Sequence, residues 1–267
     1  MTRQTFTDQL GFEVAVNHPP RRIVSLVPSQ TELLFHLGLD EEIAGITYFC
    51  IHPEDKFREK SKIGGTKKVK IEDVKALEPD LIIANKEENE KEQVDALKAY
   101  FPVWVSHVYD MDSALDMISK VGAVVGKKEE AIRLVQQINN GFRELPQISP
   151  LKTLYFIWRK PYMAAGGDTF IHYVMSKVGL KNALRDQTRY PELTTEEIQR
   201  IAPALILLSS EPYPFKERHI NELQQIVPNA EIKLVDGSMF SWYGSRMLKA
   251  VDYLQELSLD LMAGKPE

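Results

Sequence analysis

A repeated stretch constrains the fold of this chain more than any other feature of its sequence. Residues Glu72 to Ala84 return 124 residues later as Glu196 to Leu208. Each copy has an acidic first turn, a short helix with an apolar face, a proline that lacks the N–H a helix needs, and an apolar strand. Apolar strands of this kind are typical of a parallel sheet that is covered on both faces. We therefore predict two α/β lobes of similar plan, with a cleft where they meet.

The composition fits a chain with two cores of ordinary size. The 267 residues are 43% hydrophobic and 27% charged, values that are usual for globular proteins. The net charge of −5 argues against a nucleic-acid binder, which would carry a basic face. No run approaches the ~20 apolar residues of a membrane span. Cys50 is the single cysteine, so no disulfide can form within the chain.

The first residues bear on the compartment. Met1 to Asp8 contain no apolar segment and no small-residue cleavage site. We therefore expect that the chain as written carries no secretory signal. Export of a trimmed precursor and work in the cytoplasm both stay open.

Two amphipathic runs lie midway along the chain. Asp112 to Val125 has its apolar residues on one side, and a second run from Lys128 to Leu145 would span about 27 Å as a helix. This is longer than the usual connection between sheet elements, so we predict that it joins the lobes. The predicted parts are an N-terminal lobe (1–109), connecting and backbone helices (110–146) and a C-terminal lobe (147–267). An ordinary packing helix within one large domain is the alternative.

The first half also contains a strand that runs directly into a helix. Arg22 to Val27 is an apolar strand, and Ser29 and Glu32 follow it at the spacing of a capping box. Gly38 is predicted to end this helix in a left-handed conformation, and Gly179 repeats that ending in the second half. The start of the helix is thus expected at the C-terminal edge of the strand.

With these stretches identified, the chain resembles the substrate-binding proteins of ABC importers that have a helical backbone. The matching stretches are Arg22–Leu34, Glu72–Ala84, Gly166–Phe170 and Glu196–Leu208, in family order and at family spacing. That family handles cobalamin, ferric siderophores and haem, and the resemblance is closest to its cobalamin-binding branch. It implies an α/β fold of two Rossmann-like lobes with mainly parallel sheets, joined by one long interdomain helix, with the ligand held between the lobes.

The resemblance also implies how the chain meets its permease. In the family, one acidic residue on each lobe docks onto arginines of the membrane permease, and Glu72 and Glu196 occupy those positions. The local alternative is that each residue only favours a helix start, by about 0.3–1 kcal/mol. Where the cobalamin-binding branch has tryptophans in its cleft, this chain has Thr66, Asn85 and Tyr190.

Aromatic residues gather in the predicted loops at strand ends, which is where open α/β sheets bind ligands. Rigid aromatic faces suit a large planar ligand, and an arginine can pair with its carboxylate or phosphate groups. A single aromatic residue of this kind more often serves packing than ligand contact. The cluster is therefore stronger evidence for a binding site than any one of its members. The predicted ligand-binding residues are Tyr48, Phe49, Tyr190, Phe240, Trp242, Tyr243 and Arg246.

No motif predicts catalysis or a resident metal. We find no nucleophile elbow, zinc-protease helix or nucleotide loop, so no catalytic residue is assigned and no enzyme is predicted. Cys50 and His52 form the one metal-like pair, which is too few ligands for a stable site, so no metal site and no cofactor of its own are predicted. A single axial ligand to a bound haem or corrinoid, from Tyr48, His52, Tyr190 or Tyr243, stays open.

The predicted function is that of a substrate-binding protein of an ABC importer. It would capture a cobalamin-like corrinoid, a ferric siderophore or haem in the interlobe cleft and deliver it to the permease of the inner membrane. We expect a monomer with no nucleic-acid partner, periplasmic or membrane-associated by resemblance, with the cytoplasm open because no signal is visible. The alternative is a cytoplasmic corrinoid- or haem-handling protein or enzyme on the same scaffold, which turnover of the bound compound would reveal.

Overall fold

The computed structural model describes residues 2–263, which form two compact units. Unit 1 holds residues 2–108, 112–137 and 243–246, and unit 2 holds residues 109–111, 138–242 and 247–263. The chain passes from unit 1 to unit 2 within helix α6 (Lys128–Arg143). The predicted boundaries at residues 109 and 146 stay a prediction, and each unit is described by itself.

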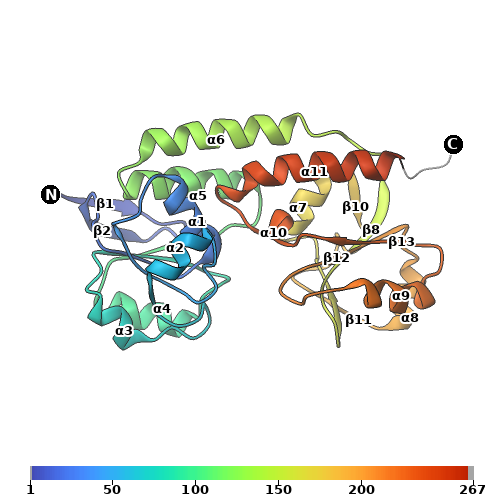
Figure 1. Ribbon diagram of the computed structural model, residues 1–267, viewed down its shortest axis with the longest axis horizontal. Coiled ribbons are helices and arrows are strands. Elements are labelled where there is room, and N and C mark those ends of the chain that lie inside the picture. The colour runs from blue at the N-terminus through green and yellow to red at the C-terminus, as the bar shows by residue number, and fades with distance from the viewer. Residues whose placement is uncertain (1, 264–267) are drawn as a thin grey trace. The chain divides into compact units, whose positions relative to one another are not determined.

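Unit 1 consists of an antiparallel hairpin and a parallel sheet in the order β5-β4-β3-β6-β7. Helices α3 and α4 cover one side of this sheet and α5 the other (Figure 1). The hairpin strands are β1 (Thr2–Thr7) and β2 (Glu13–His18). The sheet strands are β3 (Ile23–Ser25), β4 (Ile43–Ile46), β5 (Ser61–Lys62), β6 (Leu81–Asn85) and β7 (Val103–Ser106). The helices are α1 (Pro28–His36), α2 (Glu54–Glu59), α3 (Ile71–Ala76), α4 (Lys91–Lys98) and α5 (Met111–Val124).

Unit 2 contains a mixed sheet in the order β11-β9-β8-β12-β13, with β10 also paired to β8. Strands β8, β10, β12 and β13 pair in parallel. Strand β9 is antiparallel to β8, and β11 is antiparallel to β9. Helices α8 and α9 lie on one side of the sheet and α11 on the other (Figure 1). The strands are β8 (Leu151–Trp158), β9 (Tyr162–Ala164), β10 (Leu180–Asn182), β11 (Glu192–Leu193), β12 (Leu205–Ser209) and β13 (Glu231–Val235). The helices are α7 (Phe170–Lys177), α8 (Thr195–Ile201), α9 (Glu217–Ile226), α10 (Ser238–Ser241) and α11 (Arg246–Ala263).

The strand order fixes where each unit can bind a ligand. In unit 1 the chain leaves β3 toward β4 on one side and later returns to β6 on the other, so the order reverses between β3 and β6. In unit 2 the same reversal falls between β8 and β12. Loops at the carboxyl ends of the two strands diverge at such a switch point, which is where open α/β sheets hold ligands. The predicted α/β class with mainly parallel sheets is confirmed.

The sequence repeat is also a structural repeat. Helix α3 and strand β6 recur as α8 and β12, with both strands fully buried and at the same offset of 124 residues. The residue before the proline is left-handed in both copies, with φ of 44° at Glu78 and 46° at Ala202. The two units therefore share the same helix–turn–strand geometry.

The predicted capping box at Ser29 and Glu32 is wrong. Helix α1 begins at Pro28, and its N-cap Val27 makes no side-chain capping hydrogen bond. The Glu32 carboxylate accepts hydrogen bonds from Arg246 instead. A buried carboxylate gains more from a guanidinium than from one helix N–H, because the charged pair compensates the loss of water around both groups.

The other predicted helix ends are confirmed. Gly38 and Gly179 have φ of 82° and 84°, in the left-handed region that favours glycine. The two central amphipathic runs form α5 and α6. Within residues 2–263, no helix has both the length and the apolar content that crossing a membrane requires.

Candidate functional site

A buried polar network holds the loop after β6, at the switch point of unit 1. Asn85 ends β6 and is 1% exposed. Its Oδ1 accepts hydrogen bonds from two backbone N–H groups of the following loop, at 2.8 and 3.0 Å. Its Nδ2 donates to Ser106 Oγ, at the end of the neighbouring strand β7, at 2.9 Å. Asn85 therefore stiffens the loop from inside the unit.

A second asparagine ties this loop to the turn that carries Thr66. Asn89 Oδ1 accepts the Asn85 N–H at 2.8 Å, and Asn89 Nδ2 donates to the Thr66 carbonyl at 3.0 Å. Thr66 is 9% exposed. The resemblance places cleft tryptophans of the cobalamin-binding branch at Thr66, Asn85 and Tyr190. The first two of these positions thus hold small buried polar residues that brace loops.

The loop after β4 presents two aromatic side chains from a buried anchor. Cys50 is 1% exposed, and its Sγ lies 3.1 Å from both Thr31 Oγ1 and Thr47 Oγ1. Burial raises the pKa of the Cys50 thiol, so it stays protonated. The preceding residues Tyr48 and Phe49 are 47% and 59% exposed. The buried thiol therefore fixes the base of a loop whose aromatic side chains reach the surface of unit 1.

In unit 2, Trp242 is oriented by a carboxylate. Its Nε1 donates to Glu211 Oε1 at 2.7 Å, and Ser241 Oγ donates to the same oxygen at 3.2 Å. Ser209, at the end of β12, accepts the Glu211 N–H at 3.3 Å and donates to its carbonyl at 2.6 Å. Ser209 holds in the second repeat the place that Asn85 holds in the first. Each unit thus uses the last residue of the repeated strand to brace its switch-point loop.

Phe240 lies in the core of unit 2. Its side chain is 0% exposed, and its ring centroid is 5.0 Å from that of Tyr155 and 6.4 Å from that of Tyr253. The packing explains this burial, because α10 carries Phe240 on its inner side, toward β8 and α11. We assign Phe240 to the support of the Trp242 loop and not to ligand contact.

Tyr190 is positioned by the turn that contains two glycines. The preceding residue Arg189 has φ of 61°, its N–H donates to Asp168 Oδ1 at 2.5 Å, and its carbonyl accepts the Gly166 N–H at 2.8 Å. A Cβ on Gly166 would lie 2.5 Å from the Gln187 carbonyl oxygen. Only glycine at position 166 therefore lets the segment before Tyr190 approach the backbone of this turn so closely. The turn thus has a structural role.

Tyr243 and Arg246 belong to unit 1, although the residues around them in sequence belong to unit 2. They are 8% and 6% exposed. Arg246 Nε lies 2.7 Å from Glu32 Oε2, and its Nη2 lies 2.9 Å from Glu32 Oε1. This bidentate ion pair engages the guanidinium within the chain, and the role of Arg246 in ligand binding stays a prediction.

The two predicted docking residues lie in the first turns of α3 and α8, and both are exposed. The Glu72 side chain is 82% exposed, and its Oε1 lies 2.9 Å from Lys75 Nζ. At Glu196, its own backbone N–H and the hydroxyls of Thr194 and Thr195 lower the pKa of the carboxyl, so it is ionised. Both side chains therefore lie at the surface of their units, where a partner can reach them.

Sequence reasoning missed several residues of these sites. A capping box lies at Thr194 and Glu197, where each side chain satisfies the other's backbone N–H, and the Thr-x-x-Glu spacing would have predicted it. Arg159 forms an ion pair with Glu222, which lies 63 residues away in the chain and has no local sequence signal. Glu211 has no sequence signal, because nothing local shows that its carboxylate reaches Trp242.

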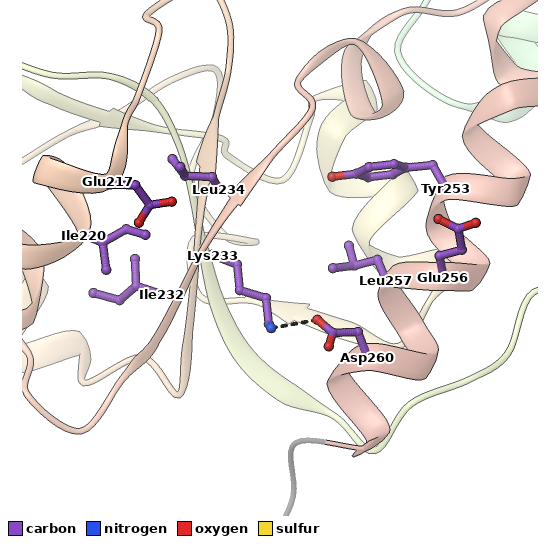
Figure 2. A pocket seen from close by; sticks show the side chains of 9 residues that line it. All are labelled: Glu217, Ile220, Ile232, Lys233, Leu234, Tyr253, Glu256, Leu257 and Asp260. Atoms are coloured by element: carbon purple, nitrogen blue, oxygen red, sulfur yellow. Dashed lines mark hydrogen bonds and ion pairs between the residues drawn. The ribbon is translucent and has the colours of Figure 1, made fainter.

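Neither a metal cluster nor the hollow beside β13 marks the site in the described part of the chain. Within the described part of the chain, no group of three or more His, Cys, Asp or Glu side chains is placed to hold a metal ion. A hollow of about 490 Å³ lies at the outer edge of the sheet, between α9, β13 and α11, and an ion pair of 2.7 Å between Lys233 and Asp260 crosses it (Figure 2). We assign no ligand to it, because it lies at the edge strand and not at the switch point.

Two α/β units, each with braced loops at a switch point, define a two-unit binding protein. The family model of the periplasmic binding proteins matches residues 23–232. The chain belongs to this family.

Curated relatives and a solved structure agree with this assignment. The "Uncharacterized ABC transporter substrate-binding lipoprotein YvrC" of Bacillus subtilis (strain 168) is 26% identical over 269 residues, which cover 94% of this chain and 84% of that protein. The "Vitamin B12-binding protein" of Yersinia pestis (strain Pestoides F) is 25% identical over 194 residues, 70% of this chain and 69% of that protein. The "Periplasmic heme-binding protein RhuT" from Roseiflexus sp. RS-1 has the same fold, with a TM-score of 0.76 and 21% identity over 90% of this chain and 97% of that one.

Proposed function

We propose that this chain is the substrate-binding protein of an ABC importer for a metal chelate or macrocycle, namely a corrinoid, haem or a ferric siderophore. The observation that carries the proposal is the match to the periplasmic binding protein family over residues 23–232. The names of two relatives support it, one as an ABC transporter substrate-binding lipoprotein and one as a vitamin B12-binding protein. The word lipoprotein in the first of these names supports a place at the outer side of the cytoplasmic membrane, and the monomeric state stays a prediction.

Aromatic side chains of both units contribute the ligand contacts in this proposal. Tyr48 and Phe49 are exposed after β4 in unit 1, and in unit 2 Trp242, after α10, is held by Glu211, which follows β12. Tyr190 and Tyr243 complete the set. Aromatic faces bind the plane of a macrocycle with little loss of side-chain entropy, because each ring has only two rotatable bonds.

The buried loop residues affect which ligand is expected. Thr66 and Asn85 stand where the resemblance expects tryptophans, and both are used for hydrogen bonds within unit 1. A cobalamin contacted by aromatic rings at those two positions is therefore not expected. In this proposal Tyr48 and Phe49 supply the ligand contacts of unit 1. Corrinoid, haem and ferric siderophore are three alternative ligands, which binding measurements distinguish.

Delivery uses Glu72 and Glu196 in this proposal. The two carboxylates stand at equivalent positions of the structural repeat, and both are exposed. Paired charges of this kind steer a partner and orient it. Each also favours its own helix start, and the two roles are compatible because an exposed carboxylate can interact with the helix dipole and with a partner at the same time.

The test is titration of the purified protein with cyanocobalamin, hemin and ferrichrome, followed by calorimetry and absorbance. We expect one compound to bind at 1:1 stoichiometry and to be recovered unchanged. Phe49→Ala and Trp242→Ala should each weaken this binding about tenfold. Phe12→Ala is the matched control, because Phe12 has the same exposed fraction of 59% as Phe49.

Two results would overturn the proposal. If none of the three compounds binds, the proposed class of ligand is wrong. Chemical conversion of the bound compound by the protein would favour an enzyme on the same scaffold.

A further inference from the structure

One lysine of α3 contacts both a carboxylate and an aromatic ring on the surface of unit 1. Lys75 Nζ lies 2.9 Å from Glu72 Oε1 and 4.1 Å from the centroid of the Tyr100 ring. We call these three residues the docking corner. Glu72 and, to a lesser extent, Tyr100 raise the pKa of Lys75, so the ammonium stays charged. The corner is therefore built to hold a cation, and the chain supplies that cation itself.

The exposure of Tyr100 suggests that the corner is incomplete in the isolated chain. Tyr100 is 61% exposed, the largest fraction among the large apolar side chains that the structure describes. Tyrosine is enriched at protein interfaces, where a partner covers the ring and its hydroxyl stays hydrated. Glu72 and the Tyr100 ring both contact Lys75 Nζ, so a single cation in the place of that ammonium would reach both groups.

An arginine fits this corner better than the lysine that now occupies it. An ammonium is a strongly hydrated point charge, whereas a guanidinium is planar, pairs with both carboxylate oxygens and stacks on an aromatic face. The Glu72–Lys75 pair is an exposed pair within one helix, and such pairs contribute little and exchange readily with solvent or a competitor.

We infer that Lys75 is an internal placeholder, which an arginine of the permease displaces when it pairs with Glu72 and stacks on Tyr100. This inference rests on the proposed docking function. It adds Tyr100 as a contact of the permease and Lys75 as a residue that weakens docking. Docking then exchanges one cation for another, so the carboxylate keeps a partner in both states.

The second repeat has no lysine at the position that corresponds to Lys75. Gln199 stands where α3 has Lys75, 124 residues earlier, and none of the described ion pairs involves Glu196. The Glu196 carboxylate is therefore open to a permease cation without competition. The two docking points differ in chemistry although their helices are equivalent, and this difference provides an internal comparison.

The experiment measures the affinity of the full-length protein for its ABC permease in lipid nanodiscs by surface plasmon resonance. Lys75→Gln should bind the permease about two- to fivefold more tightly, because the competitor is gone. Tyr100→Leu should bind about three- to tenfold more weakly. Gln199→Lys should weaken binding, because it adds a placeholder beside Glu196.

The control is Lys91→Gln, which removes the same charge from unit 1 and breaks an exposed ion pair with Asp95 of 2.7 Å, but lies outside the docking corner. Its affinity should stay within about twofold of the parent chain. An equal gain in Lys75→Gln and Lys91→Gln would mean that only net charge matters, and this would overturn the inference.

Two further outcomes separate this inference from the proposed function. If Glu72→Gln binds the permease as tightly as the parent chain, the docking role of Glu72 fails and the inference fails with it. If Glu72→Gln loses binding while Lys75→Gln stays unchanged or weakens, only the placeholder is overturned. The gain in Lys75→Gln should also shrink in the double variant with Tyr100→Leu.

Discussion

The Arg246 guanidinium lies 2.7 Å from the Glu32 carboxylate, Nε to Oε2, although 214 residues separate them in the chain. Their side chains are 6% and 10% exposed. The pair joins the start of α11 to α1 within unit 1, and it takes the carboxylate that local sequence assigned to a capping box. A buried ion pair of this kind is costly to break from one side, because the remaining charge has lost both water and partner.

Arg246→Met should lower the free energy of unfolding by about 3 kcal/mol, measured by urea denaturation. The double variant Glu32→Gln with Arg246→Met should recover part of this loss, because no uncompensated charge remains. Arg143→Met, an exposed arginine of α6, should change stability by less than about 0.5 kcal/mol. Unchanged stability together with a tenfold loss of ligand affinity would instead make Arg246 a ligand contact, as the sequence predicts.

The parts of the fold that sequence predicts are those encoded by local pattern. The two copies of α3–β6 follow from apolar strands, acidic first turns and prolines, all within 13 residues. The pairing of Glu32 with Arg246 has no such pattern, because it depends on which residues folding brings together across the chain. The same limit applies to Glu211, whose carboxylate orients Trp242 from 31 residues away.

The candidate binding residues show the same difference between what local pattern predicts and what only the folded chain shows. Sequence places aromatic residues in loops at strand ends. Tyr48 and Phe49 lie in such a loop after β4, whereas Trp242 directly follows the short helix α10. It does not predict that Phe240, in the same segment as Trp242, turns inward to pack on Tyr155. Short helices such as α10 have too few residues for a periodic pattern to show which side is buried.

Glu211→Ala should release the Trp242 indole. The indole N–H loses a charged acceptor, and hydrogen bonds to charged groups are worth about 1.5–3 kcal/mol. We expect weaker ligand binding, by about three- to tenfold by calorimetry, and a shift in Trp242 fluorescence measured in a Trp104→Phe, Trp158→Phe background. Glu211→Gln should retain most of the affinity, because its amide oxygen can still accept. Equal losses in both variants would show that the charge, and not the orientation of Trp242, matters.

His219 should make stability depend on pH in a defined direction. Its ring is 2% exposed, its Nδ1 accepts the Lys216 N–H at 2.8 Å, and burial, aided by Arg218, lowers its pKa below the ordinary 6.5. Below pH 6.5 the unfolded chain therefore binds a proton that the folded chain resists, so the free energy of unfolding falls as the pH falls. The loss begins near pH 6.5 and is complete below the folded-state pKa of His219.

Urea denaturation at pH 7.5, 6.5 and 5.5 measures this effect. His219→Gln should be less stable at pH 7.5, because a buried ring is lost, but should show a smaller fall between pH 6.5 and 5.5. The carboxyl of Glu222, whose pKa is lowered by Arg159, loses its contribution only at more acid pH, below the ordinary 4.5, and so lies outside this window. Parallel pH profiles for the two chains would contradict the role of His219.

The left-handed residues before the two prolines should respond alike to a β-branched side chain. Glu78 and Ala202 have φ of 44° and 46°, a conformation that costs non-glycine residues about 1 kcal/mol and β-branched residues more. Ala202→Val and Glu78→Val should each lower the free energy of unfolding by about 1–2 kcal/mol, measured by urea denaturation. Ala202→Gly should lie within about 0.5 kcal/mol of the parent chain, because relief of strain is offset by the greater freedom of glycine in the unfolded state.

Ala204→Val is the control for this prediction, because Ala204 is exposed beside the same proline but is not among the residues with positive φ. It should change stability by less than about 0.5 kcal/mol. A tolerated valine at one of the two sites and not at the other would show that the turns are energetically different in spite of their similar angles. Equal losses of unfolding free energy at the two sites would mean that both units keep the same strained turn. We expect this result, because the turn sets the angle between each short helix, with its exposed carboxylate, and the strand that follows.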